Sequence, residues 1–449
     1  MTEKPIIIKK PIRTTRTQQV DLQIDPQFLD ENEAVRKYRQ NAWRTYQSLP
    51  LPKGNEEEWR RTSLNSVDFS AIKIIDSGIY PEVEFPSRLS DIVAGEKSGA
   101  QLLLSPTNSQ LTIESSIVEK GVLFGSLKDM IKTNPEIIEK ILDKIQFNSA
   151  KFSALAGALD FNGVLLYVPS NTQVELPLQS VYWAPAEGYT HSLHILVHVE
   201  EGSSATFVHE AGSPIGSERD SIHAGIMELY IGRGAHLNFV ELQSWGENVI
   251  NFTRENVVID RDGSVDWIFG ALGSRLTKNY SNLNLVGQGS TGKMSGFYFT
   301  NNQQHLDHDT QQNHLAPNTT SDLLFKGALL DNSRSVWQGM IYVAPEAGKT
   351  DGYQANRNLV LSDRARADSI PGLEILTDDV RCTHGATVGK IDTEQIFYLE
   401  SRGLPRVEAE RLVVEGFFDP IMQRIPFEGV RTRFQEAIKE KMEHIGYHN

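Results

Sequence analysis

Residues 161–391 consist of short runs of β-branched and aromatic residues that are separated by glycine turns. Such runs predict many short strands rather than alternating strands and helices. Part of this tract repeats, because a glycine turn is followed four or five residues later by an aromatic and then an aliphatic residue. The three clear copies contain Gly202 and Phe207, Gly234 and Phe239, and Gly263 and Trp267, and a fainter fourth turn contains Gly289.

The spacing of these repeats predicts a coiled stack of strands. The four turn glycines are separated by 32, 29 and 26 residues, a drifting period within the range of stacked repeats. We therefore predict a mainly β protein with a right-handed parallel β-helix over residues 161–391. Phe207, Phe239 and Trp267 are expected to point inward as a stacked ladder. An antiparallel sandwich with recurrent glycine turns is the alternative.

The segments on either side of this tract show different patterns of apolar and polar residues. Residues 1–160 form a mixed region, with helical patterns over residues 31–48 and 129–145 and a short strand-like run at residues 102–104. Residues 392–449 have a helical pattern. Because exposed end coils of a β-helix invite edge pairing, these two regions are available to cap the coil.

The C-terminal region carries its own helix signals. Asp392 with Gln395 is typical of a helix start, and Gly403 is typical of a helix stop. Pro405 suits the first turn of the next helix. One apolar face of a terminal helix is formed by Phe434, Ile438, Met442 and Ile445. This face is expected to pack on the β-helix, to form a docking surface, or to do both.

Composition limits the kinds of partner. The 449 residues include 44 Lys and Arg against 58 Asp and Glu, a net charge of −14, whereas nucleic acid binding needs a concentrated basic surface. No apolar run reaches the ~18 residues of a membrane span, and a single cysteine excludes an intrachain disulfide. We therefore expect a cytoplasmic protein without nucleic acid or membrane partners. Its basic start is expected to be a disordered arm, with an organellar presequence as the alternative.

The single cysteine, Cys382, lies two residues before His384 near the end of the β-rich tract. In an extended strand the two side chains point to one face, with Cβ atoms about 6–7 Å apart. Thiolate and imidazole suit iron or an iron–sulfur cluster, but a cluster takes about four protein ligands, so such a site must borrow ligands from another chain. Nearby Arg381, His384 and Lys390 are expected to lower the pKa of the thiol. Burial as a small hydrophobic residue is the alternative for Cys382.

A second group of possible metal ligands consists of His305, Asp307, His308 and His314. Along a strand His305 and Asp307 share one face and His308 takes the other, so one compact site needs a bend or bulge. Polar stacking along the coil is therefore the expected role of these residues, and metal binding is the alternative.

Two further patterns are rejected as sites. Residues 287–294 nearly match a nucleotide-binding P-loop, but Met294 replaces the required Ser or Thr, and a strand-like sequence follows where that loop needs a helix. Asp378 and Asp379 are similar to the carboxylate pairs of β-helix enzymes that cleave polysaccharides. Adjacent strand residues point apart, however, and cannot converge on one bond.

Several stretches spread over most of the chain are similar in sequence to one known family. They are residues 378–392, 394–399 and 401–404, Leu51-Pro52 with residues 57–60, residues 305–321, and Lys326-Gly327. These stretches resemble the SufB/SufD family of iron–sulfur cluster assembly scaffold subunits. The likeness is to the SufD branch, because Leu399 stands after the Phe-Tyr pair where SufB-like chains have a cysteine.

The resemblance implies a parallel β-helix and a scaffold subunit that is not an enzyme. It implies pairing with a SufB-like subunit through the β-helix, binding of a SufC-like ATPase through the C-terminal helices, and a possible homodimer when the partner is absent. Cys382 and His384 match the family's positions for iron or a nascent iron–sulfur cluster at the interface. Glu428 corresponds to a carboxylate used in the SufB branch. Leu399, however, departs from the sequence pattern of that branch.

Two other functions stay open at this stage. One is an intracellular β-helix enzyme that acts on carbohydrate in a groove lined by Asp307, Asp309 or Asp379. The other is a purely structural adaptor for an ATPase, which is favoured if Cys382 and His384 are buried and inert.

Overall fold

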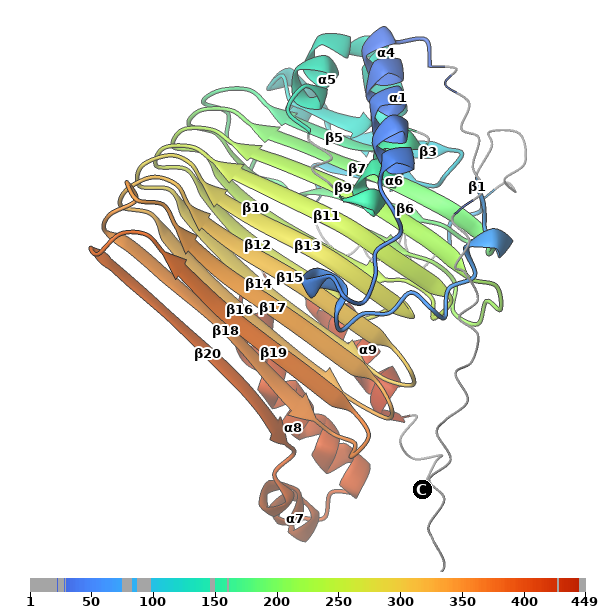
Figure 1. Ribbon diagram of the computed structural model, residues 1–449, viewed down its shortest axis with the longest axis vertical. Coiled ribbons are helices and arrows are strands. Elements are labelled where there is room, and N and C mark those ends of the chain that lie inside the picture. Colours follow the sequence, from blue (N-terminus) through green and yellow to red (C-terminus); the bar gives the residue numbers. More distant parts are fainter. Residues whose placement is uncertain are drawn as a thin grey trace, which may run out of the picture.

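The computed structural model describes residues 22, 28, 30–74, 83–86, 98–145, 150–159, 161–425 and 428–443. The expected basic arm and Ile445 lie outside these residues. Figure 1 shows a stack of parallel strands, with one group of helices at the end where the stack begins and a second group behind it. No helix within the described ranges is long and apolar enough to cross a membrane.

The stack is a parallel β-helix, as predicted. From β5 to β20, consecutive strands alternate between two sheets, and each pairs in parallel with the strand two positions later, which gives about eight coils. Sheet A contains β5 (Gly163–Val168), β7 (Tyr189–Val199), β9 (Ser221–Ile231), β11 (Val249–Ile259), β13 (Leu276–Leu285), β15 (His305–His314), β17 (Arg334–Val343) and β19 (Arg366–Ile375). Sheet B contains β6 (Leu178–Trp183), β8 (Ser204–Gly212), β10 (His236–Ser244), β12 (Ser264–Ala271), β14 (Thr291–Thr300), β16 (Thr320–Leu329), β18 (Thr350–Val360) and β20 (Val380–Lys390). This order excludes the antiparallel sandwich.

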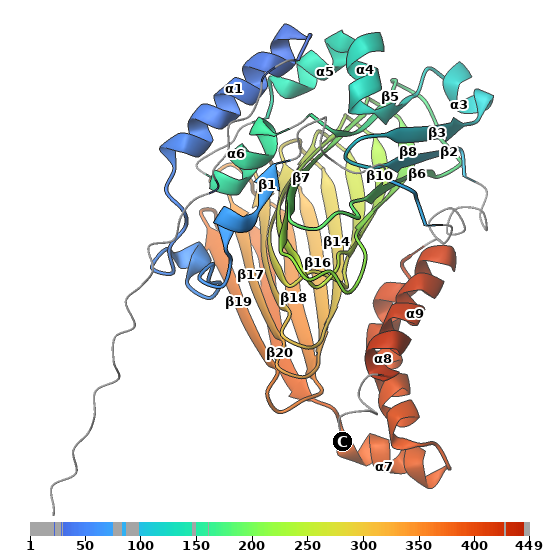
Figure 2. The same cartoon turned by 90° about the vertical axis from the view of Figure 1, so that its right-hand side faces the viewer.

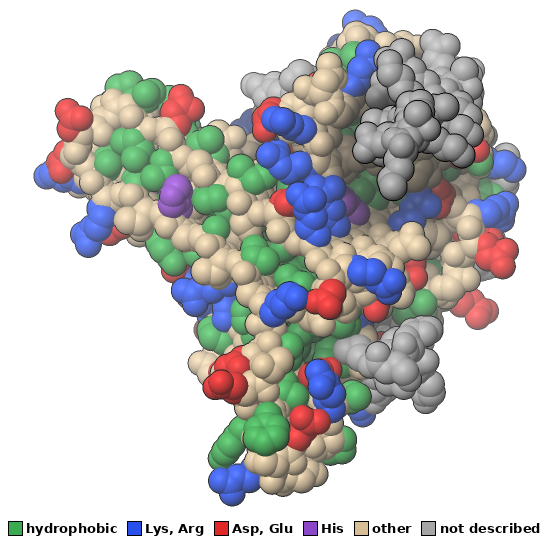
Figure 3. Space-filling model, turned by 60° about the horizontal axis from the view of Figure 1, so that its bottom comes forward, with side chains coloured by type: hydrophobic (Ala, Val, Ile, Leu, Met, Phe, Trp, Pro, Cys, Tyr) green, Lys and Arg blue, Asp and Glu red, His purple; other side chains and the backbone are tan. Residues whose placement is uncertain are grey.

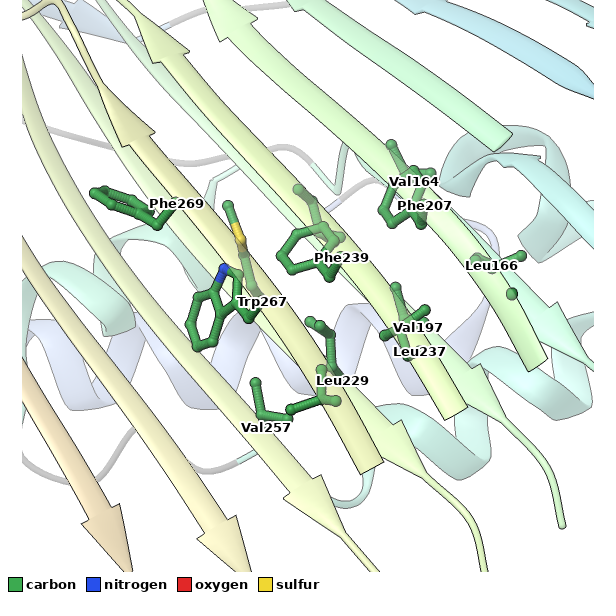
Figure 4. Close-up of a cluster of buried hydrophobic side chains, with 14 of the residues drawn as sticks. Val164, Leu166, Val197, Phe207, Leu229, Leu237, Phe239, Val257, Trp267 and Phe269 are labelled. Carbon is green, nitrogen blue, oxygen red and sulfur yellow. The ribbon is translucent and has the colours of Figure 1, made fainter. Parts of the chain in front are cut away.

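The predicted aromatic ladder is confirmed inside the coil. Phe239 on β10 is in register with Phe207 on β8 and Trp267 on β12. Its ring centroid lies 5.6 Å from that of Phe207 and 6.0 Å from that of Trp267. Figure 4 shows all three rings in one buried cluster with Leu229 and Val257 from sheet A. Identical side-chain positions therefore stack from one coil to the next.

The repeated turns were located correctly, but one differs in detail. Gly202, Gly234 and Gly289 have φ values of +67°, +62° and +76°, the left-handed region that favours glycine. At the third turn Asp262 takes this conformation instead, with φ +56°. Gly263 is needed for space, because a Cβ there would lie 2.8 Å from the carbonyl oxygen of the preceding coil.

The N-terminal region forms a cap on the first coils. Its elements are α1 (Glu33–Ser48), β1 (Lys73–Ile74), β2 (Ala100–Leu104), β3 (Ser109–Ile113), α3 (Ser115–Glu119), β4 (Leu123–Ser126), α4 (Leu127–Thr133), α5 (Pro135–Leu142) and α6 (Lys151–Ala158). The single helix expected over residues 129–145 is wrong. Asn134 leaves the helical conformation before Pro135, which lacks an N–H and starts α5 instead.

Different parts of this cap cover the outer face of sheet A and the first edges of both sheets. Helices α1, α5 and α6 pack on sheet A, where the rings of Phe152 and Phe252 stack with centroids 3.6 Å apart. Strand β4 pairs with β5, and β2 pairs with β6, so neither first edge is left open. At the opposite end, β19 and β20 are the last strands of the two sheets, and no further described strand pairs with them.

The C-terminal helices are α7 (Thr393–Ser401), α8 (Arg406–Met422) and α9 (Glu428–Glu443). Helices α8 and α9 lie along the outer face of sheet B, whereas α7 lies at one end of the molecule, as Figure 2 shows. Asp392 caps α7 and Gly403 follows its end, as expected, whereas Pro405 stands just before α8 rather than within its first turn. Phe434 packs its ring 4.1 Å from Phe297 on the sheet.

Helices α8 and α9 are therefore packed on the coil rather than separate from it. Ile438 and Met442 are buried with Phe434 in the same cluster. The ammonium group of Lys441 donates hydrogen bonds of 2.6–3.0 Å to Phe299, Asn301 and Gln304 of the coil.

We predict that Phe239→Ala lowers the free energy of unfolding by about 3–5 kcal/mol, because it leaves a cavity between two stacked aromatic residues of a close-packed core. Chemical denaturation monitored by circular dichroism measures this loss. A loss below about 1 kcal/mol would contradict the stacked-ladder account.

We also predict a pH-dependent effect of Glu228, which lies buried on β9. Burial raises the pKa of its carboxyl from the ordinary 4.5 to about 7, although Asn256 and Tyr230 donate hydrogen bonds to it. A raised carboxyl pKa stabilises the fold below pH 4.5, and this contribution is lost as the pH rises to about 7. The unfolding free energy of the wild type minus that of Glu228→Gln should therefore fall by roughly 3 kcal/mol over this window. Denaturation at several pH values measures it, and a flat difference would contradict the assignment.

Candidate functional site

The last coil, formed by β19 and β20, is open. Four large hydrophobic side chains of this coil are at least one-third exposed, and they are Leu373, Ile375, Leu376 and Val388. Figure 3 turns this end of the molecule forward and shows hydrophobic side chains spread between charged ones. An edge strand with unpaired backbone groups and exposed apolar side chains is suited to pairing with another chain.

Cys382 and His384 lie on β20, and their positions in the strand place them on one face. Cys382 is in register with Gly352 of β18, and His384 is in register with Gln354. Gln354 is fully buried, so this face of sheet B is directed into the coil. Because no further coil covers β20, the Cys382 side chain is half-buried while the His384 side chain is exposed.

The expectation of a lowered thiol pKa is wrong. Burial raises the pKa of Cys382, the N–H of Gly352 opposes this rise, and the Asp351 carboxylate adds to it. Arg381 does not help, because strand alternation turns it to the other face, where it pairs with Asp351 at 3.5 Å. The thiol is therefore protonated at neutral pH and must lose its proton before it binds a metal ion.

A third side chain reaches this site from the opposite sheet. His314 is the last residue of β15, and its Nε2 lies 3.4 Å from the position that a Cβ of Gly352 would take. The Sγ of Cys382 lies 3.2 Å from the same position. Burial lowers the pKa of His314 to about 4, which keeps the imidazole neutral. The sequence pointed to His314 only as a neighbour of His305, not of Cys382.

The other members of the histidine cluster do not join this site. His305 and Asp307 face outward and both contact Thr62 of the N-terminal region, with 2.8 Å between the His305 ring and the Thr62 hydroxyl. His308 points into the coil, where its ring lies 5.1 Å from that of Phe269. In the part of the chain that the structure describes, no three His, Cys, Asp or Glu side chains form a metal-binding group. His305, Asp307 and His308 thus contact side chains of the protein itself, and their expected polar stacking stays a prediction.

The acidic candidates have no arrangement for general acid–base catalysis. Asp307 is fully buried and pairs with Lys278 at 3.0 Å, and the same ammonium group lies 2.7 Å from Asp309. Burial raises the pKa of Asp309 to about 7. Asp379 lies in a bend before β20, and Glu428 is exposed at the start of α9. A buried ion pair leaves no free carboxylate for a sugar ring.

The near-match to a P-loop is a turn of the coil. Residues 287–289 lie between β13 and β14, and β14 begins at Thr291. The lysine of the motif, Lys293, is part of this strand and lies 3.5 Å from Asp266. A phosphate-binding helix N-terminus is therefore replaced by strand, as the sequence indicated.

The site thus offers the thiol of Cys382 and the exposed imidazole of His384 on the last coil, with the buried imidazole of His314 near the thiol. Thiolate and neutral imidazole bind iron and other transition metals, but this number is too small to hold an iron–sulfur cluster alone. A second chain on the open edge can supply the missing ligands.

Comparison with known proteins gives two family matches that together span most of the chain. The SufBD core domain of the SUF system for iron–sulfur cluster assembly matches residues 182–417, and the SufBD N-terminal region matches residues 26–180. The iron–sulfur cluster assembly protein SufD of Bacillus subtilis is 28% identical over 413 residues, which cover 91% of this chain and 94% of that protein. A SufBD family protein of Staphylococcus saprophyticus is 26% identical over 428 residues, or 92% and 90% of the two chains. Another, from Staphylococcus epidermidis, is 29% identical over 332 residues, or 74% and 71%.

Proposed function

Because the chain belongs to the SufB/SufD family of iron–sulfur cluster assembly proteins, we propose that it is a SufD-like scaffold subunit without catalytic turnover of its own. The observation that carries this proposal is the position of Cys382 and His384 on the open last coil. In this proposal residues 1–160 cap the coil, residues 161–391 form the pairing and cluster-binding core, and residues 392–449 bind the ATPase.

The open edge is the proposed surface for a SufB-like subunit. Strands β19 and β20 present unpaired backbone groups, and the apolar side chains Leu373, Ile375 and Val388 border them. Continued pairing by strands of the partner would satisfy these groups and cover this apolar surface. The same edge of a second copy can substitute, so a homodimer is proposed when the SufB-like subunit is absent.

Iron or a nascent iron–sulfur cluster is the proposed cargo of this interface. Cys382 supplies a thiolate after loss of its proton, and His384 supplies an exposed imidazole on the same face. A cluster takes about four protein ligands, so the partner supplies the others. The cargo is then held only in the assembled complex, which is what a scaffold that releases its product requires.

The first C-terminal helix is the proposed docking point for a SufC-like ATPase. Phe397 and Tyr398 of α7 are 72% and 57% exposed, far more than the apolar residues of α8 and α9 that pack on sheet B. Large exposed aromatic residues are frequent anchors of protein interfaces. The rest of the C-terminal region holds α7 at the end of the molecule (Figure 2).

The two other functions have less support. A carbohydrate-cleaving enzyme needs accessible carboxylates, whereas Asp307 is buried against Lys278. A purely structural adaptor needs inert Cys382 and His384, but the first is half-exposed and the second is exposed.

We predict that Cys382→Ser and His384→Ala each lower cluster binding at least about tenfold in the assembled complex, because each removes one ligand. The complex is reconstituted anaerobically with iron and sulfide, and bound cluster and its transfer to an acceptor are measured. Thr383→Ala is the matched control, because Thr383 lies between them on the opposite face of β20. Unchanged loading and transfer in the double variant would assign the pair a structural role.

We predict that Phe397→Ser with Tyr398→Ser weakens ATPase binding by at least about tenfold and leaves pairing with the SufB-like subunit intact. Deleting residues 392–449 is a poorer test, because it exposes the apolar outer face of sheet B. Co-purification from the native cell measures both interactions, and Ile215→Ser, at a 75% exposed position on a distant turn, is the control. Full retention of the ATPase by the double variant would exclude α7 as the docking point.

A further inference from the structure

On the inner side of the open end, a thiol and an imidazole both lie close to Gly352. This residue is on β18, the strand next to the last in sheet B, and it is in register with Ser321 on β16 and Cys382 on β20. A Cβ on Gly352 would stand 3.2 Å from Cys382 Sγ, 3.3 Å from Ile341 Cγ2 and 3.4 Å from His314 Nε2, distances tighter than most real contacts. The absence of a side chain on Gly352 therefore lets the sulfur and the imidazole nitrogen approach the same point.

Backbone geometry does not explain this glycine. Gly352 is not among the residues with positive φ, so any L-residue can adopt its conformation. Glycine inside a strand has no side chain to pack and is a poor strand former, and it often marks the close approach of another group. The residue is unfavourable for the strand itself but allows Cys382 and His314 to approach the same point.

The surroundings of His314 are polar and not fully satisfied. Its Nδ1 lies 2.7 Å from the Thr319 hydroxyl, and its Nε2 lies 2.8 Å from the Ser321 hydroxyl. Gln312 donates a hydrogen bond to the same Ser321 oxygen at 2.7 Å. The Gln312 side chain is fully buried, and its Oε1 has no hydrogen-bond partner within the described residues. A buried acceptor without a donor indicates that a further group, such as water on a metal ion, belongs here.

We propose that His314 is an inner metal ligand and that, together with Cys382, it holds a divalent transition-metal cation such as Fe²⁺ beside Gly352. This inference rests on the proposed function and adds a residue that lies far from Cys382 in the sequence. The Cys382 S–H bond breaks, its proton passes to water, and a sulfur–metal bond forms. The His314 Nε2 exchanges its contact with Ser321 for the metal, while Thr319 continues to orient the ring through Nδ1.

The two imidazoles then have different tasks. His314 is fully buried and belongs to the inner pair with Cys382, whereas His384 is exposed and is free to face the partner chain. The isolated chain is therefore expected to bind one cation before any partner arrives.

The test titrates the full chain alone with Co²⁺, whose thiolate charge-transfer absorbance reports a cobalt–sulfur bond. The wild type should show this band, and Cys382→Ser should abolish it. His314→Gln and Gly352→Ala should each weaken Co²⁺ binding at least about tenfold. Gly385→Ala is the matched control, because a Cβ there meets no atom within 4 Å, and it should bind as the wild type does.

Thermal unfolding of each variant separates lost binding from lost folding. If Gly352→Ala unfolds, His314→Gln decides the question, since Gln can keep a hydrogen bond to Thr319. Wild-type affinity in a folded His314→Gln, or no thiolate band in the wild-type chain, overturns this inference. Cluster loading by the reconstituted complex that still depends on Cys382 and His384 would show that the proposed function stands even so.

Discussion

Parallel, in-register pairing of each coil with the next is the constraint on which the rest of the structure depends. Within the coil, every strand has a neighbour on both sides, so its backbone groups are satisfied and its side chains stack on identical positions. Such a stack cannot satisfy its own ends. The N-terminal region solves this problem at one end with β2 and β4, whereas no described strand pairs beyond β19 and β20 at the other end. The structure therefore directs association, and with it the proposed chemistry, to one edge.

The side chains inside the coil change from apolar to polar toward the open end. Its middle is filled by Phe207, Phe239 and Trp267, whereas the inward positions of β18 are Gln354, Asn356 and Asn358, all buried. Buried amides cost free energy unless they are hydrogen bonded, and here Gln354 donates to the Gly372 carbonyl, Asn356 to the Tyr298 hydroxyl and Asn358 to the Ser369 hydroxyl. The polar end is the one that carries Cys382 and is open to a second chain.

The sequence was sufficient for features that depend on local spacing. Turn glycines at a drifting period predicted the coil, the aromatic residue after each turn predicted the ladder, and the i, i+2 spacing placed Cys382 and His384 on one face. It was not sufficient where distant segments meet. The approach of His314 to Cys382 depends on the number of coils between them, and the raised thiol pKa depends on which face Arg381 takes and on burial by β17. Pro135 was a sequence signal for a helix break, but the apolar pattern of residues 129–145 favoured one continuous helix.

Hydrogen–deuterium exchange shows whether another chain completes the open last coil. Amide exchange is measured across the described strands in the chain alone and in its complex with the SufB-like subunit. We expect exchange to slow in residues 366–375 and 380–390 on complex formation, because the amides that point away from the stack gain partners, while β10 in the middle of the coil is unchanged. Equal exchange of β19 and β20 in the free and the bound chain would contradict it.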